Sequence, residues 1–311
     1  MHGTRADLMG RQPGTWRYHG RFAPSPTGPL HFGSLVAALA SWCDARAAGG
    51  EWSVRIEDVD TPRSRDRAAD EMLSTLKAYG FEWEGEVVRQ SARGALYQTA
   101  LDTLAARGLI YGCACTRREL EAAPFGIIGE RKYPGTCRNG VAPGRKGRAC
   151  RLLVTDQAIG FHDRLQGWQE QHLDRDIGDF IVKRADGIFS YQLAVVVDDA
   201  AQGITHVVRG ADLLASTPRQ IWLQRQLGLP TPSYLHHPVA ILPSGEKLSK
   251  QTGARPLDDA DPLPALMRAW DFLAQAQPPA VPTSVAEFWQ WAQRAWAPTA
   301  LPPVLMLPVP R

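Results

Sequence analysis

The sequence lacks the features that mark membrane, secreted and disulfide-rich proteins. No run of about 18 apolar residues is present, which excludes a transmembrane helix. Residues 1–16 are polar and contain no apolar stretch, so they predict a flexible leader rather than a secretory signal, with Met1 or Met9 as the start. The five cysteines are an odd number, which argues against a disulfide framework. We expect a cytoplasmic, monomeric protein without a membrane partner.

Two familiar nucleotide-binding patterns are also missing. The first predicted strand is not followed by G-x-G-x-x-G, and no G-x-x-x-x-G-K-[ST] segment occurs, which excludes a dinucleotide fingerprint and a P-loop. The composition, with 44% apolar and 22% charged residues, is typical of a globular protein. A formal net charge of +3 permits a polyanionic partner without requiring one.

Strand and helix patterns alternate along the first third of the chain. A short strand at 18–22, an amphipathic helix at 30–48 and a strand at 52–56 form a β-loop-α-β unit. A further helix starts at Thr61 and Pro62, and another spans about 92–107. Because such crossovers join parallel strands, we expect an α/β fold around a parallel sheet.

The alternation stops after residue 110 and resumes near residue 180. The resumed part contains helices at 192–200 and 216–227 with a strand at 205–209 between them, and one more helix is predicted after the capping box that begins at Ser284. We therefore divide the chain into a leader (1–16), the first half of a sheet domain (17–110), an insertion (111–178), the second half (179–255) and a short helical tail (256–311).

A Pro/Gly loop from Pro24 to Ser34 leads from the first strand into the first helix. Gly28 and Gly33 allow backbone to approach a polyphosphate, and a helix N-terminus favours negative charge. His31 can donate a hydrogen bond to phosphate oxygens as charge moves onto a leaving pyrophosphate. A proline-rich turn with an incidental histidine is the alternative. We predict Gly28, His31, Gly33 and Ser34 as ATP-binding residues.

The second motif is Lys247-Leu248-Ser249-Lys250-Gln251, in a loop that begins at Pro243. Paired lysines suit a transition state in which triphosphate charge peaks as the α-phosphorus is attacked. A solvated lysine-rich turn is the more common meaning of such a segment taken alone. Together the two motifs predict an ATP site that adenylates a carboxylic acid, with His31, Lys247 and Lys250 as catalytic residues and Lys250 also binding ATP.

These motifs resemble those of class I aminoacyl-tRNA synthetases of the glutamyl type. His31 to Ser34 is similar to their HIGH signature and Lys247 to Gln251 to their KMSKS signature, and the likeness covers about residues 17–255. The resemblance implies a Rossmann-like catalytic domain that joins L-glutamate to ATP with Mg²⁺. It also implies a glutamate pocket built by Arg21, Phe22, Ala23, Pro24, Ser25, Glu57, Tyr191 and Arg209.

Physical chemistry agrees with an acidic substrate. Arg21 and Arg209 each end a predicted strand, and ligands bind at the carboxyl edge of open α/β sheets. Two guanidiniums can clamp a carboxylate, and Glu57 offers a negative group to an α-ammonium. Surface ion pairs for the arginines and a packing role for Tyr191 are the alternatives. No general base is expected, because a substrate carboxylate is already ionised. Asp198 and Asp199 are interpreted as structural or N–H-capping residues, with Mg²⁺ ligation as the alternative.

The chain departs from ordinary members of that family in two ways. It has no anticodon-binding region after the second motif, and Ala211 to Leu214 replaces a segment that usually carries an acidic residue and a histidine. Both departures resemble a truncated branch of the family, which implies glutamate activation without tRNA, then esterification of glutamate to queuosine at the wobble position of tRNA(Asp). The alternatives are a short enzyme that charges tRNA(Glu) and a non-catalytic, zinc-bearing RNA-binding paralogue.

Three cysteines gather in the predicted insertion. Cys113, Cys115 and Cys137 suit Zn²⁺, which prefers four tetrahedral N or S ligands. Chemistry alone leaves Tyr133, Cys150, His162 or water as the fourth ligand, and three free cysteines as the alternative to any metal. The family resemblance selects Tyr133 and implies one structural zinc per chain. Several basic residues nearby could contact phosphates or form a solvated face: Arg117, Arg118, Arg131, Lys132, Arg145, Lys146 and Arg148.

Overall fold

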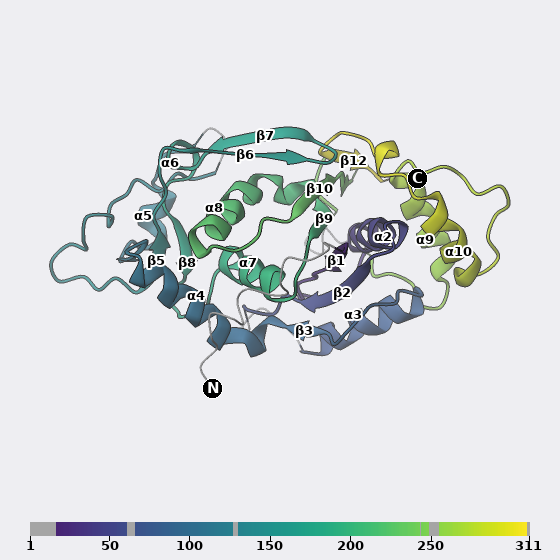
Figure 1. The fold of residues 1–311 in the computed structure, drawn as a ribbon, viewed down its shortest axis with the longest axis horizontal. Coiled ribbons are helices and arrows are strands. Elements are labelled where there is room, and N and C mark those ends of the chain that lie inside the picture. The colour runs from purple at the N-terminus through teal and green to yellow at the C-terminus, as the bar shows by residue number, and fades with distance from the viewer. Residues whose placement is uncertain (1–16, 61–65, 127–129, 243, 249–254, 310–311) are drawn as a thin grey trace.

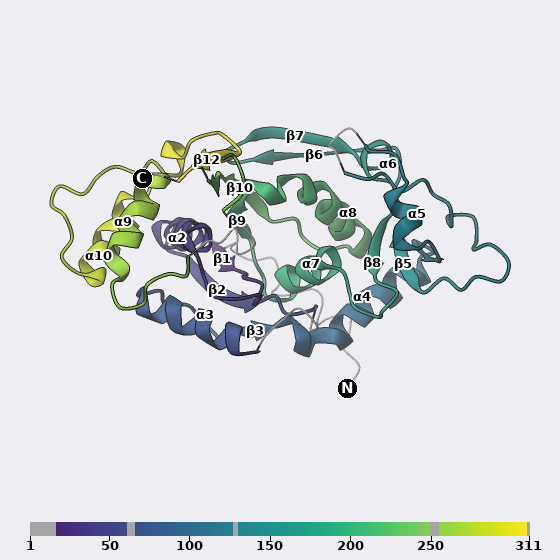
Figure 2. The same cartoon turned by 180° about the vertical axis from the view of Figure 1, so that it is seen from behind.

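The computed structural model describes residues 17–60, 66–126, 130–242, 244–248 and 255–309. The predicted leader, the predicted helix start at Thr61 and Pro62, and Ser249, Lys250 and Gln251 of the second motif lie outside the described residues. Figures 1 and 2 show a central sheet flanked by helices, with a smaller sheet at one end and helices α9 and α10 at the other.

Two groups of parallel strands build the central sheet. Strands β1 (His19–Phe22), β2 (Glu51–Ile56) and β3 (Val88–Arg89) form one, and β9 (His206–Gly210) and β10 (Ser233–His237) belong to the other. The groups meet where Thr205 N donates to His19 O at 2.9 Å. Across the sheet the strands lie in the order β3-β2-β1-β9-β10. Successive strands are therefore added toward one edge from β1 and toward the opposite edge from β9, and ligands bind at such a switch point in doubly wound folds.

Helices cover both faces because neighbouring strand residues point in opposite directions. Val208 and Leu235 face one core, which includes α2 (Phe32–Ala47), α3 (Asp66–Ala78) and the C-terminal helices. Val207 and Tyr234 face the other, which includes α4 (Gly94–Ala106), α7 (Tyr191–Ala201) and α8 (Thr217–Leu227). The 3-10 helices η1 (Gln90–Arg93) and η2 (Ala211–Ser216) precede α4 and α8.

The middle of the chain forms a separate antiparallel sheet and a long hairpin. Strands β4 (Ile110–Cys113), β5 (Ala149–Leu152) and β8 (Phe180–Lys183) make the sheet, which the short helix α5 (Arg117–Glu121) accompanies. The hairpin of β6 (Ala158–Asp163) and β7 (Gly167–His172) leads into α6 (Leu173–Asp176). Its strand β6 pairs with β10 through Asp163 and Tyr234, so this hairpin extends the central sheet.

The C-terminal segment is more structured than the sequence indicated. It contains α9 (Pro262–Phe272), α10 (Val285–Ala295), η4 (Pro298–Ala300) and β12 (Met306–Pro308), and β12 pairs with β11 (Val239–Ile241). The prediction of a single helix here was wrong. The prolines at the start of α9 argue against a helix on sequence grounds, although proline is well tolerated in a first turn.

The predicted start of α10 is present in altered form. Ser284 Oγ accepts from Glu287 N at 3.2 Å, whereas the Glu287 carboxylate accepts from Thr283 N at 2.7 Å instead of closing the box on Ser284. The predicted α/β class I fold, with its parallel sheet, inserted cysteine-bearing sheet and helical tail, is confirmed. Among the described residues, every helix is too short or too polar to cross a membrane.

Candidate active site at the junction of β1 and β9

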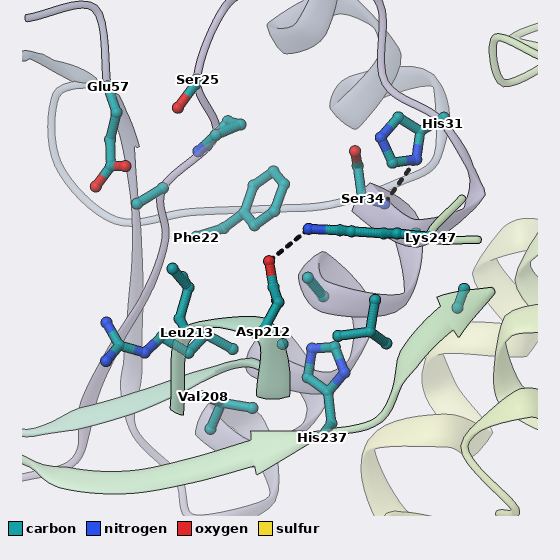
Figure 3. Close-up of a pocket in the computed structure, with 18 of the residues that line it drawn as sticks. Phe22, Ser25, His31, Ser34, Glu57, Val208, Asp212, Leu213, His237 and Lys247 are labelled. Atoms are coloured by element: carbon teal, nitrogen blue, oxygen red, sulfur yellow. Dashed lines mark hydrogen bonds and ion pairs between the residues drawn. The ribbon is translucent and has the colours of Figure 1, made fainter. Parts of the chain in front are cut away.

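A cavity of about 760 Å³ lies at the carboxyl ends of β1 and β9. Figure 3 shows Glu57 and Ser25 on one side of it and His31, Ser34 and Lys247 on the other. Twelve residues predicted from the sequence line it: Arg21, Phe22, Ala23, Pro24, Ser25, His31, Gly33, Ser34, Glu57, Tyr191, Arg209 and Lys247. Gly28 is not among the lining residues, and Lys250 lies outside the described chain. Their roles stay predictions, but the structure brings the twelve together.

The first motif is held at the N-terminus of α2. His31 is the N-cap residue, and its Nδ1 accepts from Ser34 N at 3.4 Å. A Cβ on Gly33 would lie 3.2 Å from the His31 ring and 3.7 Å from Leu248 O of the second motif. A side chain at position 33 would therefore crowd the histidine, which explains the glycine.

The two motifs are brought together by backbone pairing. His31 forms an antiparallel bridge with Pro256, and Leu257 N donates to Leu30 O at 3.0 Å. Leu248 N donates to Ala240 O at 2.9 Å, which fixes the start of the second motif against β11. Segments from opposite ends of the chain thus form one wall of the cavity.

Lys247 forms an ion pair with Asp212, which lies just after β9. Both side chains are accessible, with 52% of Lys247 and 35% of Asp212 exposed. Figure 3 shows the Lys247 side chain reaching across the cavity toward Asp212. A cation held at this place can exchange its carboxylate partner for another anion.

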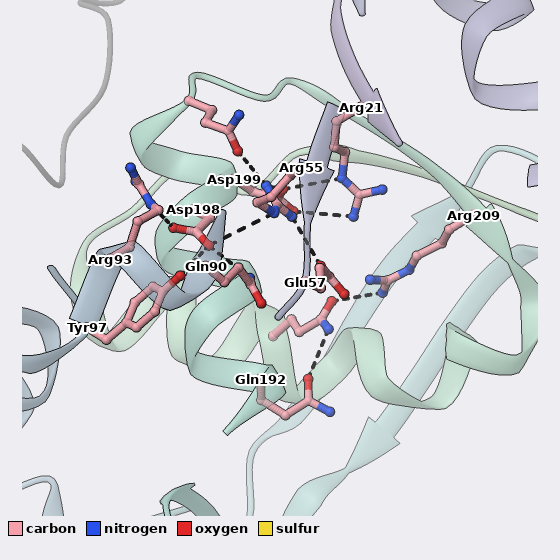
Figure 4. Close-up of polar contacts among 12 residues, drawn as sticks. Arg21, Arg55, Glu57, Gln90, Arg93, Tyr97, Gln192, Asp198, Asp199 and Arg209 are labelled. Atoms are coloured by element: carbon pink, nitrogen blue, oxygen red, sulfur yellow. Dashed lines mark hydrogen bonds and ion pairs between the residues drawn. The ribbon is translucent and has the colours of Figure 1, made fainter. Parts of the chain in front are cut away.

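A buried ionic network lies at the other end of the cavity (Figure 4). The Nε and Nη2 atoms of Arg21 donate to the two oxygens of Asp199 at 3.3 and 3.5 Å. Arg55 Nη1 lies 2.8 Å from Asp199 Oδ1, and its Nη2 lies 3.5 Å from Glu57 Oε1. Burial alone would raise the pKa of Asp199, but Arg21 and Arg55 outweigh it and lower that pKa. The predicted structural role of Asp199 agrees with this geometry.

Arg209 is held in a different way, by neutral groups. Its Nε donates to His236 Nε2 at 3.0 Å, and its Nη2 donates to Thr217 Oγ1 and Gln220 Oε1, both at 2.8 Å. The remaining nitrogen, Nη1, is buried and has no hydrogen-bond partner among the described residues. Because Arg209 lines the cavity, this nitrogen is the donor that a ligand could use. Arg209 can therefore donate to a ligand carboxylate from one nitrogen, Nη1, and not from two nitrogens at once.

Two further side chains complete this end of the cavity. Burial raises the pKa of the Glu57 carboxyl, although Arg55 and Arg21 oppose the change. Burial also raises the pKa of the Tyr191 hydroxyl, with Glu57 adding to the effect. Tyr191 therefore remains a hydrogen-bond donor over the whole physiological pH range. The end of the cavity that Arg21 and Arg209 line can thus match both charges of an amino acid.

Asp198 is structural, as expected. It is fully buried, and its carboxylate accepts from Gln90 Nε2 at 2.9 Å, Arg93 Nε at 2.5 Å and Tyr97 Oη at 2.7 Å. Three donors on one fully buried carboxylate agree with the structural role expected of Asp198.

Sequence reasoning missed Asp212 and His237. Asp212 follows β9 and His237 ends β10, both at the carboxyl edge of the sheet, so strand position was the signal that could have found them. His237 Nδ1 lies 2.9 Å from Pro238 O, to which it donates, and its buried Nε2 has no partner among the described residues. His237 lines the cavity, and the lone pair on its Nε2 receives no hydrogen bond from the described residues.

The predicted metal ligands converge in the antiparallel sheet. The sulfurs of Cys113, Cys115 and Cys137 lie within 4.8 Å of one another, and those of Cys115 and Cys137 are 3.7 Å apart. Sulfurs bound tetrahedrally to zinc at about 2.3 Å are separated by about 3.8 Å. The donor set therefore fits a metal ion such as zinc.

The position of Tyr133 favours it among the possible fourth ligands. Its hydroxyl lies 3.7 Å from Cys113 Sγ and 3.9 Å from Cys115 Sγ. Cys150 packs instead against the core that contains α4 and α7, and His162 pairs with Trp168 in the hairpin.

Arg151 compensates the charge of the cluster. Its Nε donates to Cys113 Sγ at 3.2 Å, and its guanidinium lies 3.6 Å from the centre of the Tyr133 ring. Burial would raise the pKa of the Cys113 thiol, but the hydrogen bonds from Arg151, the Cys115 backbone and Tyr133, with the charge of Arg151, together outweigh burial, and the pKa falls to about 7. A thiolate is the form that binds a metal.

Comparison with known proteins indicates the same class of enzyme as the geometry of the site. Residues 18–276 match the family described as tRNA synthetases class I (E and Q), catalytic domain. A glutamate-tRNA synthetase from Elizabethkingia anophelis has the same fold, with a TM-score of 0.74 and 23% identity over 93% of this chain and 67% of that one. Fold and site thus define a ligase of the class I tRNA synthetase type.

Two curated relatives narrow the family further. The glutamyl-Q tRNA(Asp) synthetase of Dechloromonas aromatica is 58% identical over 92% of this chain and 96% of its own length. The protein of the same name from Aromatoleum aromaticum is 54% identical over 94% and 93%. The chain belongs to the glutamyl-Q tRNA(Asp) synthetase family.

Proposed function

We propose that this enzyme activates L-glutamate with ATP in the absence of tRNA and transfers the glutamyl group to queuosine at the wobble position of tRNA(Asp). One observation carries the first step. A single cavity joins two buried guanidiniums, Arg21 and Arg209, to a helix N-terminus and a lysine, His31 and Lys247. The first pair suits a side-chain carboxylate, and the second suits a triphosphate.

Activation requires positioning and charge stabilisation rather than a general base. The ionised α-carboxylate oxygen attacks the α-phosphorus of ATP, and the bond to pyrophosphate breaks. His31, the α2 N-terminus, Lys247 and Lys250 stabilise the negative charge that shifts onto pyrophosphate. Mg²⁺ bound with ATP would add positive charge to the same oxygens. Glu57 attracts the α-ammonium, which orients the amino acid.

Transfer completes the reaction. A hydroxyl of queuosine attacks the carbonyl carbon of glutamyl-adenylate, an ester forms, and AMP leaves with the electron pair of the broken bond. The names of relatives above 50% identity support tRNA(Asp) and queuosine as the acceptor.

We further propose one structural Zn²⁺ per chain, held by Cys113, Cys115, Cys137 and Tyr133. The metal would cross-link β4 to the loop that carries Cys137. Metal analysis of purified protein should give about one zinc per chain. Cys113→Ser should lose that zinc, whereas Cys150→Ser, a matched change outside the cluster, should retain it. Full metal content in Cys113→Ser would contradict the assignment.

Two assays test the function. The first follows glutamate-dependent exchange of pyrophosphate into ATP without tRNA; its absence would refute activation and favour a non-catalytic RNA-binding paralogue. The second follows radiolabelled glutamate with ATP onto tRNA(Asp) with and without queuosine, beside tRNA(Glu). We expect labelling of the queuosine-bearing tRNA(Asp) alone. Labelling of tRNA(Glu) instead would make the protein a short translation synthetase.

A further inference from the structure

The two arginines of the cavity differ in how their charge is balanced. Arg21 touches a carboxylate directly, that of Asp199. Arg209 touches three neutral acceptors, from His236, Thr217 and Gln220. A carboxylate placed on a guanidinium competes with an anionic ligand for its donors, whereas neutral acceptors orient the group and leave its charge available.

The negative charge that balances Arg209 belongs to Asp163, which reaches Arg209 through His236 and not directly. His236 Nδ1 is 2.6 Å from Asp163 Oδ2, and both side chains are fully buried. The other oxygen, Oδ1, accepts from the backbone N–H groups of Leu165 at 3.0 Å and Gln166 at 2.9 Å, and that of His236 at 3.2 Å. These bonds fix the Asp163 carboxylate in one orientation.

This arrangement determines which nitrogen of His236 carries the proton. An ionised carboxylate only accepts hydrogen bonds, so Nδ1 of His236 must donate to Asp163. In the neutral ring Nε2 then carries a lone pair, which is what the Nε–H of Arg209 requires. Burial lowers the pKa of His236 to about 4, which keeps the ring neutral near physiological pH.

We propose that Asp163 and His236 are positioning residues that hold Arg209 for the side-chain carboxylate of the substrate. This inference rests on the proposed function. The Asp163–His236–Arg209 chain fixes the guanidinium of a residue that lines the cavity and leaves its Nη1 without a partner among the described residues. Because Asp163 ends β6, the inserted hairpin takes part in the selection of the amino acid.

Asp163→Asn is the sharpest test. Oδ1 of the new side chain can keep its backbone bonds, and the amide nitrogen then faces His236 Nδ1 as a donor. The ring would shift its proton to Nε2 and present a second donor to Arg209, as inverted tautomers do in other Asp-to-Asn variants. We expect the KM for glutamate in pyrophosphate exchange to rise at least tenfold while the KM for ATP is unchanged.

Matched variants separate positioning from general loss of stability. Asp179→Asn removes another buried carboxylate, just before strand β8 of the antiparallel sheet, and should leave the KM for glutamate unchanged. His236→Gln keeps one donor and one acceptor and should raise that KM less than His236→Leu does. Thermal unfolding of each variant reports on stability. An unchanged KM for glutamate in folded Asp163→Asn would overturn the inference.

A spectroscopic measurement gives a second, independent arm. ¹⁵N chemical shifts of labelled histidine should show His236 protonated on Nδ1 in the native protein and on Nε2 in Asp163→Asn. Native His236 protonated on Nε2 would refute the positioning chain even if glutamate is activated normally. Absence of glutamate-dependent exchange in the native enzyme would instead refute the proposed function, and with it this substrate.

Discussion

The two ends of the cavity are built in opposite ways. At the end proposed to bind the amino acid, Arg21 and Arg209 are 4% and 5% exposed, and each donates hydrogen bonds to buried partners. At the end proposed to bind the nucleotide, Lys247 and Asp212 face each other as an accessible ion pair. The first end is preorganised before substrate arrives, whereas at the second end one contact must be exchanged for another.

The difference indicates where specificity and turnover are controlled. A guanidinium that is already fixed loses little conformational entropy when a carboxylate binds, so it discriminates strongly between an acid and an amide. Under the proposed function, Lys247 gains its full effect only when triphosphate replaces Asp212, so its contribution should fall on the reaction step. Variants at the first end should change the KM for glutamate, whereas variants at the second end should change kcat or the KM for ATP.

Arg209→Met should have the largest effect. Loss of the buried guanidinium removes a charged partner of the substrate carboxylate, a change that typically costs 2–5 kcal/mol, or about thirty- to several-thousandfold. We expect kcat/KM for glutamate in pyrophosphate exchange to fall by about a thousandfold. The matched control is Arg46→Met, on the outer end of α2 where Arg46 pairs with Glu84, and it should stay within about twofold. A fall of less than tenfold in kcat/KM for glutamate in Arg209→Met would contradict the idea that this end is preorganised for the substrate carboxylate.

Lys247→Met should have the next largest effect, of another kind. Removing one cation that stabilises the charged transition state should lower kcat by about thirtyfold, less than for a buried donor because Lys247 is half exposed. The KM for glutamate should remain within about twofold. Lys77→Met, a surface lysine that lies over Trp83, serves as the control. If only the KM for glutamate changed, the two ends of the cavity would not have separate roles, which would contradict this prediction.

Much of this division could be predicted from the sequence. Arg21 and Arg209 lie near the carboxyl ends of predicted strands, and parallel strands place such residues at one edge, so their meeting follows from the fold. The first motif was predicted from the need for backbone near phosphate, and the structure places His31 and Gly33 at the cavity, whereas Gly28 is not among its lining residues. These features are local or depend only on strand order.

The partners of those residues could not be predicted in the same way. Asp163 lies in a stretch that lacks the βα alternation, and its contact with His236 depends on a single register between β6 and β10. The ion pair of Lys247 with Asp212 likewise depends on how a loop returns to β9. Such contacts arise from tertiary packing between distant segments, on which hydrophobic periodicity carries no information.

The buried histidine of the amino-acid end also predicts a pH dependence of stability. The pKa of His236 falls from its ordinary value of 6.5 to about 4 in the folded protein, chiefly through burial. Between these values the unfolded chain binds more protons, so the free energy of unfolding must decrease as pH falls from about 6.5 toward 4. Denaturant unfolding should show a loss on the order of 2 to 3 kcal/mol from this group.

The comparison with His236→Gln isolates that contribution. His206 and His237 also have lowered pKa values because of burial, and they add to the slope in both proteins. The native protein should therefore lose more stability than the variant over the same pH range. Equal slopes would show that His236 is not held neutral by its surroundings.

Asp212→Asn should have the smallest effect and the opposite sign. The change removes the competitor for Lys247 and one negative charge from the wall that faces the triphosphate. Because accessible ion pairs contribute only about 0.2–1 kcal/mol, we expect the KM for ATP to fall by about two- to fivefold with the KM for glutamate unchanged. Lys247→Met combined with Asp212→Asn should show no such gain, since the competition no longer exists. A rise in the KM for ATP in the single variant would mean that Asp212 helps to bind the nucleotide, and the nucleotide end would then be as preorganised as the other.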